Sequence, residues 1–104
     1  MMTRQQYLFG KLAEECAELA KEAIKCQQFG VLHVFGNAKG VTNIERLNGE
    51  FNDVMGVIDM LNENITEEWQ PTTNVISVHP DKVSAKVAKV QRWFDVAQEM
   101  GMVK

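Results

Sequence analysis

The sequence predicts an all-α fold, in which an antiparallel helical hairpin is followed by a third helix. Apolar residues recur every three to four positions in three long segments, as they do on the buried face of a helix. Glycines at 30, 36 and 40 separate the first two segments, and prolines at 71 and 80 separate the last two. At 104 residues with 45% hydrophobic content, the chain is expected to form one domain over residues 1–104.

The first helix is expected from about Arg4 to Gln28, with Gly30 as its stop. The segment from Gly30 to Thr42 then predicts a loop with a short turn around Val31 to Phe35. The first helix places apolar residues on one face at Leu8, Leu12, Cys16, Leu19 and Ala23.

The second helix is expected to begin near Thr42 or Asn43, either of which can cap it, and to run to about Asn64. An extended segment from Trp69 to His79 should follow, because Pro71 opposes helix. Pro80 suits the first turn of the third helix, which should end before Gly101.

The two cysteines are expected to be free thiols. Cys16 and Cys26 are ten residues apart on one predicted helix, which is about 15 Å along its axis and too far for a disulfide. Cys16 falls in the apolar arc with Leu12 and Leu19, so it is interpreted as a small core residue.

The predicted helices carry acidic residues at positions that should face inward. On a helical wheel Glu50 lies about 20° from both Val57 and Leu61, and Glu15 lies about 20° from Leu8. Burying an unpaired carboxylate costs several kcal/mol, so these acids require protons, basic partners or a metal cation.

The spacing of the acids favours the cation. Residues three apart are neighbours on a helix, so Glu15 pairs with Glu18, and Glu50 pairs with Asp53. Two such helices packed face to face would bring up to four carboxylates to one point, which suits Mg²⁺ or Mn²⁺.

The order EExxE followed by ExxD, here Glu14-Glu15-x-x-Glu18 and Glu50-x-x-Asp53, resembles the all-α nucleoside triphosphate pyrophosphohydrolases of the MazG type. The words QFG at 28–30 and TNIERL at 42–47 are similar to small phage-type members, and the resemblance covers about residues 5 to 65. The connection between the two clusters is longer than in compact members, which leaves the substrate open.

The resemblance implies magnesium ligands at Glu15, Glu18, Glu50 and Asp53, with Mn²⁺ as a substitute. It also implies hydrolysis of a nucleoside triphosphate between the α and β phosphates, which releases a monophosphate and pyrophosphate. Glu14 or Glu15 could take the proton of the attacking water.

Basic and aromatic residues are candidates for substrate binding. Lysines at helical spacing could hold the phosphate tail, an aromatic ring could stack on the base, and an amide could read its edge. These candidates are Lys11, Lys86, Lys89, Trp69 and Asn43.

Composition limits the partners. The net charge is −3 and there is no large basic tract, so nucleic acid is not expected. No apolar run approaches the roughly 20 residues of a membrane span, and the start MMTRQQYLFG lacks the apolar core of a signal peptide, so a cytoplasmic protein is expected.

Two other classes of protein are alternatives. A ferritin-like di-iron bundle requires Glu-x-x-His pairs, which the chain lacks. A non-catalytic dimeric interaction module would explain amphipathic helices, but not Glu50 within an apolar stripe. Because one hairpin and one helix offer a small core, two chains are expected to pair into a four-helix bundle; a tetramer stays open.

Overall fold

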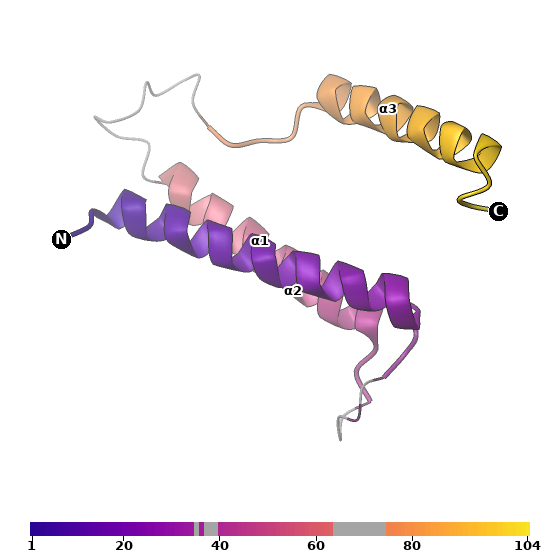
Figure 1. Cartoon of the computed structure of the whole chain (residues 1–104). Coiled ribbons are helices and arrows are strands. Elements are labelled where there is room, and N and C mark those ends of the chain that lie inside the picture. Colours follow the sequence, from indigo (N-terminus) through magenta and orange to yellow (C-terminus); the bar gives the residue numbers. More distant parts are fainter. Residues whose placement is uncertain (35, 37–39, 64–74) are drawn as a thin grey trace.

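The computed structural model describes residues 1–34, 36, 40–63 and 75–104, which contain three helices and no strand (Figure 1). These helices are α1 (Arg4–Phe29), α2 (Asn43–Glu63) and α3 (Pro80–Glu99). The all-α prediction is therefore confirmed for the described part of the chain, with helix ends close to those expected.

Local hydrogen bonds define both ends of α1. Thr3 Oγ1 accepts a hydrogen bond from the Gln6 backbone N–H at 3.1 Å, and Gln6 Oε1 accepts one from the Thr3 N–H at 2.9 Å. This reciprocal capping box satisfies two amide groups that have no partner inside the helix. At the other end the Gly30 N–H donates to the Cys26 carbonyl at 3.0 Å. Gly30 has a φ of 95°, which a residue with a Cβ would adopt only with strain.

Thr42 caps α2, as the sequence suggested. Its Oγ1 accepts from the Glu45 N–H at 3.3 Å and donates to Glu45 Oε1 at 3.0 Å. The backbone N–H groups of Asn43 and Ile44 donate to loop carbonyls, those of His33 and Val31, at 2.9 Å each. The loop thus satisfies the first amides of α2 and closes the hairpin, with the expected turn at Val31 and Leu32.

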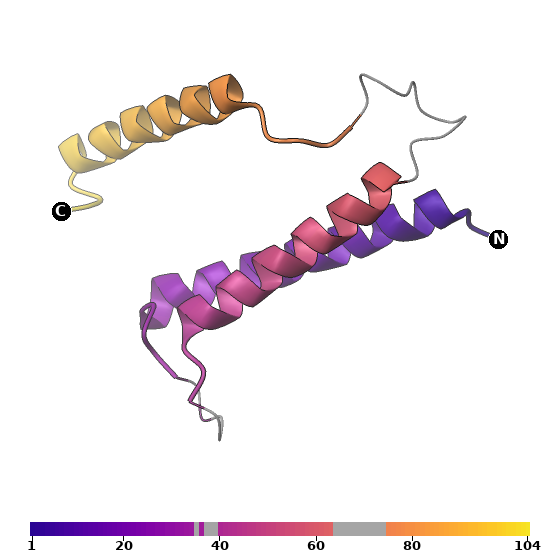
Figure 2. The same cartoon turned by 180° about the vertical axis from the view of Figure 1, so that it is seen from behind.

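Helices α1 and α2 pack antiparallel along their length (Figures 1 and 2). The core of the pair is narrow: the buried apolar residues of the described chain are Leu8, Val54 and Leu61. Cys16 was expected in this core, and that prediction is wrong for the single chain, because the residue is exposed. Its position lies beyond the arc of α1 that α2 covers. Both cysteines are free, as predicted.

Helix α3 lies apart from the hairpin, and no described part of it contacts α1 or α2 (Figures 1 and 2). The chain is tied to the end of α2 just before α3 begins. Asn62 accepts a hydrogen bond from the Ile76 N–H at 2.9 Å and donates to the Ile76 carbonyl at 2.8 Å. Residues 75–79 form neither helix nor strand, and the rest of the segment expected to be extended lies outside the described residues.

Among the helices that the structure describes, none combines the length and apolar character that a membrane span needs.

Candidate metal centre

The closed end of the hairpin sets the register that aligns the acidic residues. Asn43 is fully buried, and its Nδ2 donates to the carbonyls of Gly30 at 3.0 Å and of Lys25 at 3.4 Å. Since the helices are antiparallel, moving seven residues forward from Asn43 on α2 and seven back from Lys25 on α1 reaches Glu50 and Glu18. Three further residues reach Asp53 and Glu15.

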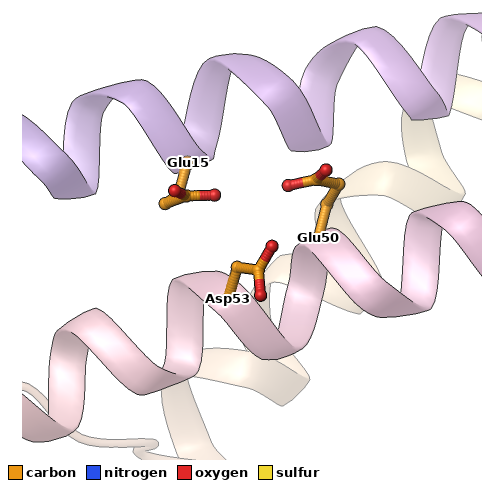
Figure 3. Close-up of side chains that lie close together, drawn as sticks. All are labelled: Glu15, Glu50 and Asp53. Atoms are coloured by element: carbon orange, nitrogen blue, oxygen red, sulfur yellow. The ribbon is translucent and has the colours of Figure 1, made fainter.

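Glu15, Glu50 and Asp53 form the centre of the site, and we call them the carboxylate triad (Figure 3). One carboxylate oxygen from each residue lies within 4.8 Å of one from each of the others. Glu15 and Glu50 are half-buried between the helices, and Asp53 is exposed at the rim. The sequence-based prediction that acids from the two helices converge is therefore met for these three.

The surroundings of Glu50 disfavour its charged form. Loss of contact with water raises the pKa of Glu50 above its ordinary value of 4.5, and the charge of Asp53 raises it further. The charges of Glu15 and Glu18, and a hydrogen bond with Glu15, act in the same direction. Negative charge is therefore concentrated here, and no described lysine or arginine forms an ion pair with the triad.

Glu18, a predicted ligand, lies beside the triad and acts on Glu50 through its charge. Glu14, a predicted catalytic residue, is exposed and pairs with Lys11, with 3.0 Å between its Oε2 and Lys11 Nζ. The hydrogen bond and charge of Glu14 raise the pKa of Lys11, with smaller effects from Tyr7 and Glu15. Lys11 is thus a permanent cation one helical turn before Glu15.

Three other predicted binding residues, all in the described part of the chain, are not brought to the triad. Lys86 and Lys89 lie on α3 with their Nζ atoms 4.6 Å and 5.1 Å from the Trp93 ring centroid. Asn43 uses its amide to join α1 to α2, about 10 Å along the helix from Glu50. Trp69 lies outside the described residues. Their roles in substrate binding stay predictions.

Glu22, which was not among the residues predicted from the sequence, is only 6% exposed. Its Oε1 accepts from Lys25 Nζ at 3.4 Å, while its buried Oε2 has no hydrogen-bond partner among the described residues. Arg46 stands at the same level of the antiparallel register and has a buried Nε that is likewise unpartnered within the described part. The sequence does indicate the side of α1 on which Glu22 lies, because this residue is seven positions after Glu15 and so shares its inward face of the helix.

The donor set of the triad is chemically selective. It consists only of carboxylate oxygens, which hard divalent cations such as Mg²⁺ and Mn²⁺ prefer, and no described histidine or cysteine joins it. A bound cation would offset the mutual repulsion of the three charges. The residues present therefore fit a magnesium ion and do not fit a zinc site of nitrogen and sulfur ligands.

Comparison with known proteins gives no match to a family model, to a curated protein or to a solved structure.

Proposed function

We propose that this protein is a magnesium-dependent nucleoside triphosphate pyrophosphohydrolase, which cleaves between the α and β phosphates to give a monophosphate and pyrophosphate. The observation that carries the proposal is the carboxylate triad, built from two antiparallel helices with oxygens within 4.8 Å. Its residues belong to the two acidic motifs, EExxE and ExxD, by which the sequence resembles pyrophosphohydrolases of the MazG type.

Glu15, Glu50 and Asp53 would hold the cation, and Glu18, whose charge acts on Glu50, is a candidate fourth ligand. Two of the ligands are half-buried, so the folded hairpin orients them before the cation binds. When bound, Mg²⁺ supplies charge neutralisation at phosphate oxygens and lowers the pKa of water. Mn²⁺ should substitute, because it shares the preference for oxygen ligands.

Side chains of the protein would accept the proton of the attacking water and bind the phosphates. Glu14 or Glu15 would take the proton from the attacking water. Glu14 is held by Lys11, so Lys11 positions this carboxylate and adds a positive charge for the phosphate chain. Lys86 and Lys89 could contribute only if α3 approached the triad.

We expect the active form to be a homodimer, with a tetramer as a larger assembly. The hairpin has a narrow core of its own, and pairing would complete a four-helix bundle. A nucleoside triphosphate substrate would place the enzyme in the cytoplasm.

The decisive experiment measures monophosphate and pyrophosphate separately across a panel of canonical and modified nucleoside triphosphates with Mg²⁺. Glu50→Ala removes one ligand of the triad, and Asp59→Ala is the matched control. Asp59 is an exposed acid on the same helix, outside the triad. We expect wild type and Asp59→Ala to release both products from at least one nucleotide, and Glu50→Ala to release neither.

Thermal unfolding with and without Mg²⁺ distinguishes a panel that lacks the substrate from a protein that lacks the metal site. A rise in Tm for wild type and Asp59→Ala but not for Glu50→Ala would support the metal site even if the panel lacks the substrate. No turnover, together with the same Mg²⁺ response in all three proteins, would reject the metal site and favour the interaction module.

A further inference from the structure

One side of the hairpin is an exposed apolar surface, which we call the hairpin face. It consists of Ala13, Cys16, Ala20 and Ile24 from α1 and Ile44, Phe51, Met55 and Ile58 from α2. Met55 and Ile58 are half-buried, and the other six are exposed. Ile44, Phe51 and Ile24 remain 41%, 48% and 51% exposed. A polar surface would be expected on a hairpin that stayed alone in water.

Helical periodicity places this surface on one side, away from the triad. On each helix the residues of the hairpin face are rotated by roughly 80–120° about the helix axis from the residues that contact the other helix. The sense of this rotation is the same on both helices. Because the two helices are antiparallel, apolar strips that are displaced in the same rotational sense face the same side of the hairpin. Glu18 and Asp53 are displaced in the opposite sense, so the triad opens on the other side of the hairpin.

Helix α3 carries a second apolar surface, which we call the α3 seam. Its residues recur at spacings of four, three, four and three: Val83, Val87, Val90, Phe94 and Ala97. Such spacing is typical of a helix that packs lengthwise on another helix. Val87 is nevertheless 65% exposed, and the described part of α3 contacts neither α1 nor α2.

The solvent-accessible area of the chain indicates how much surface a partner could cover. The chain exposes 8116 Å², whereas a compact chain of 11.8 kDa exposes about 5,900 Å². Its radius of gyration is 17.8 Å, against about 13 Å for a compact domain of this length. Two copies covering this excess would bury roughly 4,400 Å², within the range of obligate homodimers.

We propose that α3 is an exchanged arm, whose seam packs on the hairpin face of a second copy of this chain. The two surfaces match in length: the seam from Val83 to Ala97 and the α2 strip from Ile44 to Ile58 each span about 21 Å. This inference does not depend on the proposed reaction. It makes the partner's α3, and not the partner's hairpin, the element that covers the hairpin face.

Charge favours the hairpin, and not a second α3, as the surface that the arm contacts. Helix α2 has one basic and five acidic side chains, while the first thirteen residues of α3 have four basic and one acidic. Two α3 helices would bring their lysines together, whereas α3 on a hairpin pairs opposite net charges. In this arrangement Lys86 and Lys89 flank the interface and do not hold phosphate.

The connection to α3 favours exchange over folding back. The two hydrogen bonds between Asn62 and Ile76 hold the chain at the end of α2, only four residues before Pro80. From there α3 runs apart from its own hairpin in both views (Figures 1 and 2). A hollow of about 390 Å³ beside Val78, Val83 and Val87 can receive an apolar side chain from one end of the partner's α2 strip, such as Ile44 or Ile58.

Cross-linking through the native Cys16 tests the exchange. In a Cys26→Ser background, one seam residue at a time is replaced in Val83→Cys, Val87→Cys and Val90→Cys. Ala88→Cys, on the opposite side of α3, and the background alone are the controls. After treatment with a short bifunctional maleimide, we expect covalent dimers from the seam variants and none from the controls. Links within single chains would overturn the exchange, as would the absence of any link.

A second measurement tests the hairpin face independently of thiol chemistry. Phe51→Glu should weaken the dimer at least about tenfold by light scattering across a dilution series, because it places a charge in an apolar contact. Asn52→Glu, at the adjacent exposed position, should leave dimerisation unchanged. Circular dichroism confirms that both variants are helical. Equal dimer affinities for the two variants, or a monomeric wild type, would overturn the proposal.

Discussion

Replacing Asn43 by Asp is expected to loosen the closed end of the hairpin and, through it, the carboxylate triad. The side chain is 0% exposed, and its Nδ2 donates to two backbone carbonyls, those of Gly30 and Lys25. Aspartate has the same size but no N–H group, so its carboxylate would face two carbonyl oxygens without water. Asn43→Ala removes the same donors without adding a charge.

These contacts determine how much unfolding free energy each substitution should remove. Each hydrogen bond contributes about 1 kcal/mol net, so losing both costs about 2 kcal/mol. In Asn43→Ala this loss is partly offset, because Oδ1, which has no hydrogen-bond partner among the described residues, is removed as well. We expect a loss of about 1–2 kcal/mol for Asn43→Ala and at least about 3 kcal/mol for Asn43→Asp, which leaves a buried charge unpaired.

Urea unfolding, followed by circular dichroism at one fixed protein concentration, measures these losses. The response of Tm to Mg²⁺ should fall in the same order, because Asn43 sets the register that places Glu15 opposite Asp53. Asn52→Asp, at an exposed position on the same helix, is the control for added charge. If Asn43→Asp were as stable as this control, the register argument would be refuted.

Three further predictions follow from particular contacts. The raised pKa of Glu50 means that the metal-free fold binds its proton more tightly than the unfolded chain, whose pKa is near 4.5; the stabilising effect is complete below that pH and is lost as pH rises through the folded pKa. Wild type without Mg²⁺ should therefore gain more stability on acidification from pH 7 to 5 than Glu50→Gln, and equal gains in urea titrations would contradict this sign. Leu61→Ala should cost about 2–5 kcal/mol in urea unfolding, because Leu61 is 1% exposed; a loss below 1 kcal/mol would mean that the hairpin core repacks freely. Thr42→Ala should cost about 1 kcal/mol by the same method, because it removes the cap on the Glu45 N–H, whereas Thr42→Ser, which keeps the hydroxyl, should restore most of the stability.

Much of the fold was predictable because it depends on local sequence. The capping group of Thr42, the stop at Gly30 and the start at Pro80 act within a few residues of where they stand. The pairing of Glu15 with Glu18, and of Glu50 with Asp53, follows from the helical repeat alone. The meeting of the two acidic pairs also requires that the two helices pack face to face as an antiparallel hairpin.

The exposure of Cys16 and the burial of Glu22 could not be derived from the periodicity of one helix. Cys16 was assigned to the core because it extends an apolar arc, but one neighbouring helix covers only part of that arc. Glu22 does not stand out in the sequence, because acids on helices are commonly solvated, yet it is buried in the folded hairpin. Both outcomes depend on the width of the contact between two helices.

By itself, the sequence determined three helices, their ends, and which acids share a helical face, because each depends on residues a few positions apart. Only the tertiary structure decided that Glu15 joins Glu50 and Asp53 within 4.8 Å, and that α3 leaves its seam exposed. These features depend on register and on which surfaces meet. Register is fixed by contacts between distant residues, here Asn43 with Gly30 and Lys25, and no local pattern contains that information.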